Sequence, residues 1–118
     1  LPLHSGRPRQ IAAVVERGVD RVAPMYVLAL QMDLHIGHAH SLKDKRGVLR
    51  SMIDGAQRRF HVAAAEVDHQ QLWQRTSLGF AAVSASQQHT TEVIDEVSRF
   101  IWSFPEVEVL QEERTWLS

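Results

Sequence analysis

The apolar residues of this chain fall into successive segments whose spacing is that of a strand or of a helix. From Tyr26 to Ile36 every second residue is apolar, which predicts a β-strand. Residues 41–60 carry apolar side chains at helical spacing, and residues 61–67 and 75–85 are predicted to be two strands joined by a hairpin. The first part of the domain is therefore predicted as strand, helix, strand, strand.

A second helical stripe follows, from Val93 to Phe104, and Pro105 ends it. Residues 106–114 are predicted to form the last strand. The order is then β-α-β-β-α-β, which for a small domain predicts an α+β, ferredoxin-like sandwich. Its four-stranded antiparallel sheet would carry both helices on one face.

A chain of 118 residues, 44% of them hydrophobic, can bury one sizeable core. We place that core in a ferredoxin-like domain of residues 25–118. Residues 1–24 are punctuated by proline and glycine, and we expect a poorly ordered extension with one short helix from Arg9 to Arg17.

Composition excludes several classes of protein. The chain has no cysteine, so it can form no disulfide and cannot use a thiolate as a metal ligand or nucleophile. A net charge of -1 excludes a uniformly basic protein. The sequence has no run of about 18 apolar residues that could span a bilayer, and because its first residues lack the charged and then apolar pattern of a secretory signal, we expect none. We therefore expect a soluble cytoplasmic protein with no membrane partner.

The expected topology brings three segments to one end of the sheet. The first two strands run parallel on either side of the third, so the loop after the first strand, the start of the first helix and the hairpin all lie at that end. These segments hold the residues of chemical interest, which are His35, His38, His40, Ser41, Lys43, Lys45, Arg46, Asp68, His69, Trp73 and Arg75.

An anion or RNA site is the best fit to these residues. The start of a helix offers free backbone N–H groups and a positive dipole end. Residues 41–60 hold six basic and two acidic side chains, whereas residues 92–114 hold two basic and seven acidic ones. We predict that phosphate groups bind Ser41, Lys43, Lys45, Arg46, Arg50, His69, Trp73 and Arg75.

Two plainer interpretations of these residues stay open. The basic helix face can be a solvated surface that only keeps the protein soluble, or it can bind another protein. Within the hairpin, Trp73 can fold back over the end of the core while Glu66 or Asp68 pairs with Arg75.

A metal site is the alternative prediction. His35, His38, His40 and His69 could supply imidazole ligands to zinc or a similar ion, although their spacing matches no dedicated zinc motif. Asp68 beside His69 could act as an acid and base pair, but no nucleophile motif accompanies them. We predict no cofactor, and the sequence does not indicate a small-molecule ligand.

The sheet face away from the core is predicted to carry small side chains. If Phe80 points into the core, the open face holds Ala29, Gln31, Asp33, Gly79, Ala81 and Val83. These offer no aromatic rings on which RNA bases could stack, as a four-stranded RNA-binding sheet requires. Small apolar side chains suit close contact between two sheets, so we predict a homodimer through this face.

Three motifs resemble a known family: SLKDKR at the first helix, AEVDHQQLWQR in the hairpin and PEVEVL in the last strand. They are similar to those of the YlxP-like family of small bacterial proteins, over about residues 25–117. The resemblance implies the same fold but no catalytic residues, because the family is a domain of unknown function. Members are often encoded beside genes for transcription elongation, translation initiation and ribosome maturation, which implies an RNA context. His38 and His40 stand where members commonly carry other residues.

We therefore expect a non-enzymatic accessory protein that binds RNA or a ribosomal particle in translation or ribosome maturation. The alternative is a small homo-oligomeric metal-binding protein or enzyme that uses the histidine cluster.

Overall fold

The computed structural model describes residues 24–118, which contain the six predicted elements in the predicted order. They are β1 (Tyr26–His35), α2 (Leu42–Phe60), β2 (Ala63–Asp68), β3 (Arg75–Ser84), α3 (Gln87–Trp102) and β4 (Glu108–Trp116). The extension and the short helix predicted within residues 1–24 lie outside the described residues, except for Pro24.

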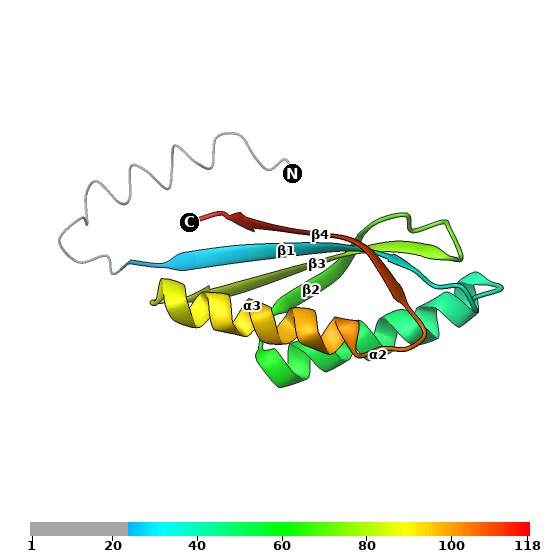
Figure 1. Ribbon diagram of the computed structural model, residues 1–118, viewed down its shortest axis with the longest axis horizontal. Coiled ribbons are helices and arrows are strands. Elements are labelled where there is room, and N and C mark those ends of the chain that lie inside the picture. Colours follow the sequence, from blue (N-terminus) through cyan, green and yellow to red (C-terminus); the bar gives the residue numbers. More distant parts are fainter. Residues whose placement is uncertain (1–23) are drawn as a thin grey trace.

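The four strands form one sheet in the order β2-β3-β1-β4, and all neighbours are antiparallel. Both helices cover the same face of this sheet (Figure 1). The predicted α+β ferredoxin-like fold is confirmed. Because β1 and β2 run in the same direction on either side of β3, the end of β1 and the β2–β3 hairpin lie at one end of the molecule.

Helix α2 begins at the predicted cap. The hydroxyl of Ser41 accepts a hydrogen bond from the backbone N–H of Asp44 at 3.0 Å. The Asp44 carboxylate accepts in return from the N–H of His40 at 3.1 Å, one residue before the position expected for a capping box. The helix ends at His61, whose left-handed conformation (φ 55°) lets its N–H bond to the carbonyl of Gln57.

Helix α3 starts earlier than its apolar stripe, because the Ser86 hydroxyl caps it by accepting from the N–H of His89 at 3.1 Å. It ends at Trp102, before Pro105. In residues 24–118 neither helix is long and apolar enough to cross a membrane. Pro105 and Glu106 form a turn, so β4 begins later than predicted and spans residues 108–116 and not 106–114.

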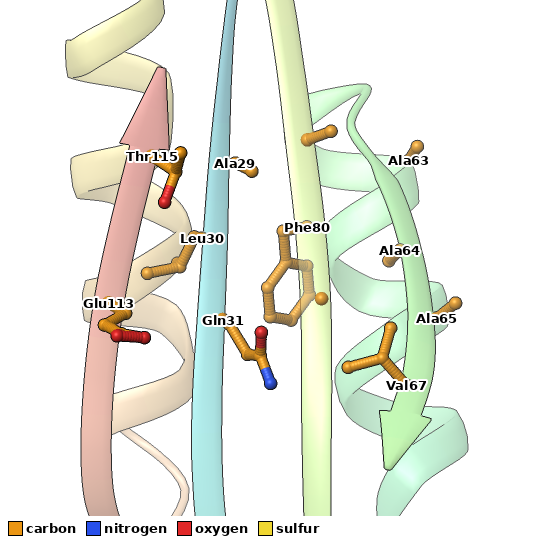
Figure 2. Close-up of a pocket in the computed structure, with 12 residues that line it drawn as sticks. Ala29, Leu30, Gln31, Ala63, Ala64, Ala65, Val67, Phe80, Glu113 and Thr115 are labelled. Carbon is orange, nitrogen blue, oxygen red and sulfur yellow. The ribbon is translucent and has the colours of Figure 1, made fainter. Parts of the chain in front are cut away.

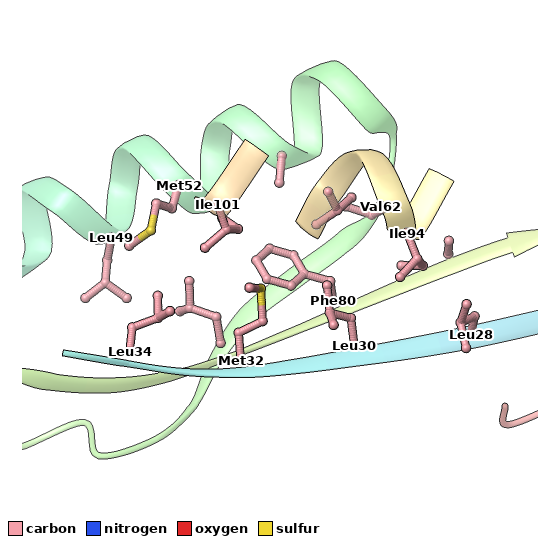
Figure 3. Close-up of a cluster of buried hydrophobic side chains, with 14 residues drawn as sticks. Leu28, Leu30, Met32, Leu34, Leu49, Met52, Val62, Phe80, Ile94 and Ile101 are labelled. Atoms are coloured by element: carbon pink, nitrogen blue, oxygen red, sulfur yellow. The ribbon is translucent and has the colours of Figure 1, made fainter. Parts of the chain in front are cut away.

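The core lies between the sheet and the two helices (Figure 3). Alternate residues of β1 point into it, and Phe80 of β3 lies among them, as the sequence predicts. The helices approach closely at Gly55, where an added Cβ would stand 2.6 Å from Cζ of Phe100. Because Phe80 points into the core, its neighbour Gly79 lies on the opposite face of the sheet, the one without helices.

Candidate functional site

The predicted meeting of the β1 loop, the start of α2 and the hairpin is confirmed by direct bonds. The N–H of Ile36 donates to the carbonyl of Gln74 at 2.9 Å. The Gln74 side-chain amide donates to the carbonyls of Gly37 at 3.2 Å and Ala39 at 3.1 Å. The hairpin is thus fixed to the loop that leads into α2.

Lys45 joins the start of α2 to the hairpin and to β2. Its residue surface is only 1% exposed, and its ammonium group donates to the carbonyls of His69 and Leu72, both at 2.7 Å. It also lies 2.8 Å from the carboxylate of Glu66. A buried ammonium with an anion and two carbonyls around it has its hydrogen-bonding capacity filled.

Glu66 completes a buried network with Thr76. The Thr76 hydroxyl, which is fully buried, donates to the same Glu66 oxygen that faces Lys45, at 2.7 Å. Glu66 therefore pairs with Lys45 and not with Arg75, which makes no ion pair to any described residue. The Nε atom of Arg75 is buried without a hydrogen-bond partner in residues 24–118.

These contacts remove Lys45 from the predicted anion site, because its amine points inward. The signal was present in the sequence: Lys45 lies one helical turn before Leu49 and shares the inward stripe of Met52 and Ala56. A lysine on an apolar stripe, opposite an inward-facing glutamate of a strand, is typical of a buried pair.

The hairpin tip presents two large apolar side chains to solvent. His69 adopts a left-handed conformation (φ 63°), and the Leu72 N–H closes a turn by donating to the His69 carbonyl at 3.1 Å. Leu72 is 48% exposed and Trp73 is 52% exposed. Trp73 does not fold back to complete the core. It lines an open groove that runs from His40 along the hairpin to Arg75.

The remaining predicted basic residues lie on the outer face of α2. Lys43, Arg46 and Arg50 are exposed and follow each other at helical spacing. None of the three forms a salt bridge with another described residue. The predicted role of Ser41 changes, because its hydroxyl and the Asp44 carboxylate already cap the helix start where an anion was expected.

The four predicted metal ligands do not assemble. His35 lies 3.6 Å from Glu108 of β4, whereas His69 lies on the hairpin 4.0 Å from Asp68. His38 and His40 are exposed. Across the part of the chain that the structure describes, no three side chains of the histidine, cysteine or carboxylate type come together to hold a metal. The histidines inferred to form a cluster therefore lie apart, with His35 on the sheet and His69 on the hairpin.

Comparison with known proteins gives this arrangement a family. A family model described as "Protein of unknown function (DUF503)" matches residues 27–114, which include every residue of the site. The chain belongs to the DUF503 family. A similar protein is the "Uncharacterized protein YlxP" of Bacillus subtilis (strain 168), with 47% identity over 70 residues, or 59% of this chain and 76% of that protein. The predicted resemblance to the YlxP-like family is confirmed, and DUF503 carries no assigned activity.

Proposed function

We propose that this DUF503 protein is a non-enzymatic accessory protein that binds RNA or a ribonucleoprotein in translation or ribosome maturation. The contact surface is the outer face of α2 together with the tip of the β2–β3 hairpin. One observation carries the proposal: buried Lys45 fixes the hairpin beside the start of a basic helix, and this leaves Trp73 half exposed.

The charge distribution supports a polyanionic partner. Lys43, Arg46 and Arg50 project from α2 without an ion pair to any described residue, so their charges are free to meet phosphates. Phosphate contacts supply most of the affinity of proteins for nucleic acids and act by releasing counterions. Six of the seven acidic side chains within residues 92–114 lie on α3 and β4, and they would orient a polyanion toward α2.

Trp73 supplies the second part of the surface. An exposed aromatic ring can stack on an unpaired base, which contributes about 1–3 kcal/mol per base. The hairpin backbone around Trp73 is held by Lys45 and Gln74, so little conformational entropy is lost when the ring binds. His40 and Arg75 line the same groove and can contact the sugar and phosphate of that nucleotide.

We propose further that the working form is a homo-oligomer. The sheet face without helices lies opposite α2, so pairing through it leaves the proposed RNA surface free (Figure 1).

Binding to ribosomal subunits tests the RNA proposal. The full chain is sedimented with purified subunits of Bacillus subtilis at low and at high salt. We expect co-sedimentation at low salt that disappears at high salt. Arg46→Glu should abolish it, whereas Arg99→Glu, the same charge change on the exposed surface of α3, should not. Trp73→Ala should weaken it more than Trp102→Ala, which removes an equally exposed tryptophan. Migration of the wild-type chain away from both subunits at low salt would overturn the proposal.

A further inference from the structure

The sheet face opposite the helices is apolar over β2, β3 and the start of β1 (Figure 2). Its side chains are short and border one shallow hollow of about 420 Å³; they include Ala29, Ala63, Ala65, Val67, Gly79 and Ala81. Among residues 24–118 nothing covers this face. Val67 is 48% exposed and Val83, which follows on β3, is 62% exposed. A sheet face of this composition is typical of a contact surface.

Val67 and Gly79 together keep this face of the sheet flat. Val67 is the extra residue of a bulge in β2, and its side chain lies across Gly79 of β3. A Cβ at position 79 would stand 3.0 Å from Cγ1 of Val67. Because glycine has no Cβ, the Val67 side chain can pack directly against the backbone of β3. The bulge therefore fills the sheet surface with an apolar side chain that would otherwise project from it.

Polar groups on this face lie toward one end and along the edge strand β4. The Gln31 amide donates to the Ser77 hydroxyl at 2.9 Å. Asp33 of β1 lies beyond the apolar region, beside Gln111, whereas Glu113 borders the hollow from the edge strand β4. Within the apolar region the central strands β1 and β3 thus carry no charge, and the Glu113 carboxylate stands on the edge strand β4, at the rim of the hollow.

We propose that the face is the interface of a homodimer in which the sheets of two copies pack against each other. Strands about 4.8 Å apart that average about 30 Å in length give the whole four-stranded face, the β4 edge included, roughly 570 Å² per copy. The pair would bury roughly 1,100 Å², which exceeds the about 1,000 Å² that a specific interface needs. A surface of small apolar side chains with no charge at its centre is complementary to itself, and a two-fold axis matches the same patch on both copies.

This dimer names the interface of the homo-oligomer proposed above; it rests on that proposal and does not depend on RNA binding. Both helices lie on the other side of each sheet, so the paired molecule would have its two α2 surfaces on opposite outer faces (Figure 1). A partner with two suitable sites would then be bound bivalently, with higher affinity than one copy can provide.

Mass measurement of the full chain in solution tests the interface. Sedimentation equilibrium should give twice the mass of one chain. Ala65→Arg, at an exposed position of β2, should give the mass of one chain with the circular dichroism spectrum of the folded protein unchanged. Gln88→Arg adds the same charge on the exposed surface of α3 and should leave the dimer intact.

Cross-linking supplies a second measurement that does not depend on weakening the interface. The chain has no cysteine, so Ala81→Cys introduces a single thiol at the centre of the face. A short bifunctional maleimide should link two copies through it, because packed sheets lie about 10 Å apart. Gln88→Cys should not be linked. A wild-type chain that sediments as one copy would overturn the proposal. The face would then be covered by another segment of the chain or by another protein. A dimer that Ala65→Arg leaves intact and Ala81→Cys does not link would overturn it too.

Discussion

The ammonium group of Lys45 lies 2.8 Å from the carboxylate of Glu66, and the two side chains are 2% and 20% exposed. The pair joins the first turn of α2 to β2, and the same ammonium holds two carbonyls of the hairpin. Charges removed from water are tolerated only when their remaining donors and acceptors are filled, as they are here. Lys45 therefore holds the hairpin from the helix side, while Gln74 fixes it to the loop before α2.

Replacing Lys45 by methionine should be strongly destabilising. Methionine has a side chain of nearly the same length, but among the described residues it leaves the Glu66 carboxylate with only the Thr76 hydroxyl, and it leaves two carbonyls without the donor that Lys45 supplied. Loss of one member of a buried pair costs about 3–5 kcal/mol in the free energy of unfolding. Urea denaturation followed by circular dichroism measures this.

Two further variants decide whether the buried pair is the cause. Lys43→Met, an exposed lysine two residues earlier, should change stability by less than about 0.5 kcal/mol. Lys45→Met with Glu66→Gln should recover part of the loss, since the uncompensated carboxylate is gone. Equal stability of Lys45→Met and Lys43→Met would contradict the assigned role of Lys45.

The two glycines of α2 should respond in opposite directions to alanine. A Cβ at Gly47 meets nothing within 4 Å, so Gly47→Ala should stabilise the protein by about 0.5–1 kcal/mol through helix propensity. A Cβ at Gly55 would stand 2.6 Å from Phe100, whose ring is packed against Phe60 and Phe104. Gly55→Ala should therefore destabilise by about 1–2 kcal/mol. Thermal unfolding of both variants checks this, and a stabilising Gly55→Ala would show that the Phe100 ring moves freely.

His61 ends α2 in a left-handed conformation that costs a residue with a side chain about 1–2 kcal/mol. His61→Gly should raise the free energy of unfolding by a few tenths to about 1 kcal/mol, because glycine adopts this conformation freely but is also more flexible when unfolded. Arg58→Gly, three residues earlier inside the helix, should lower it by about 1 kcal/mol. The two substitutions change the free energy of unfolding in opposite directions only if His61 is the helix cap. Chemical denaturation measures both changes.

The salt dependence of RNA binding should separate the two parts of the proposed surface. Each lost phosphate contact reduces the slope of log K against log salt by about 0.7–0.9. Lys43→Ala should show this reduction, whereas Trp73→Ala should lower affinity at every salt concentration with the slope unchanged. Fluorescence anisotropy of a labelled hairpin RNA measures both, and an altered slope for Trp73→Ala would contradict the stacking role.

Local pattern was sufficient to predict the fold. Alternation in β1 placed Leu30 in the core and Ala29 on the open face, and the helical stripe of α3 identified Ile94 and Val97 as buried. The same pattern assigned Phe80 to the core, which fixed the face that now carries Gly79. These predictions succeed because burial of one face sets the register of a strand or helix.

The site was harder to predict because it depends on contacts between distant segments. Lys45 and Lys43 look alike in sequence, and the partner of Lys45 is on β2, more than 20 residues away. The four histidines are close in the predicted topology, yet His35 lies on the strand and contacts β4 while His69 stays on the hairpin. Trp73 could fold inward or outward, and in the structure it is half exposed, next to the Leu72 carbonyl that Lys45 binds.

Strand β4 pairs with β1 along nearly its whole length, and the pairing extends to Val27, which bonds Leu117 and Ser118. β1 is the first strand of the domain to be synthesised and β4 is the last. Until β4 emerges from the ribosome, one side of β1 is an unpaired edge bearing the apolar residues of the core. Completion of this sheet is therefore delayed to the end of translation of the domain.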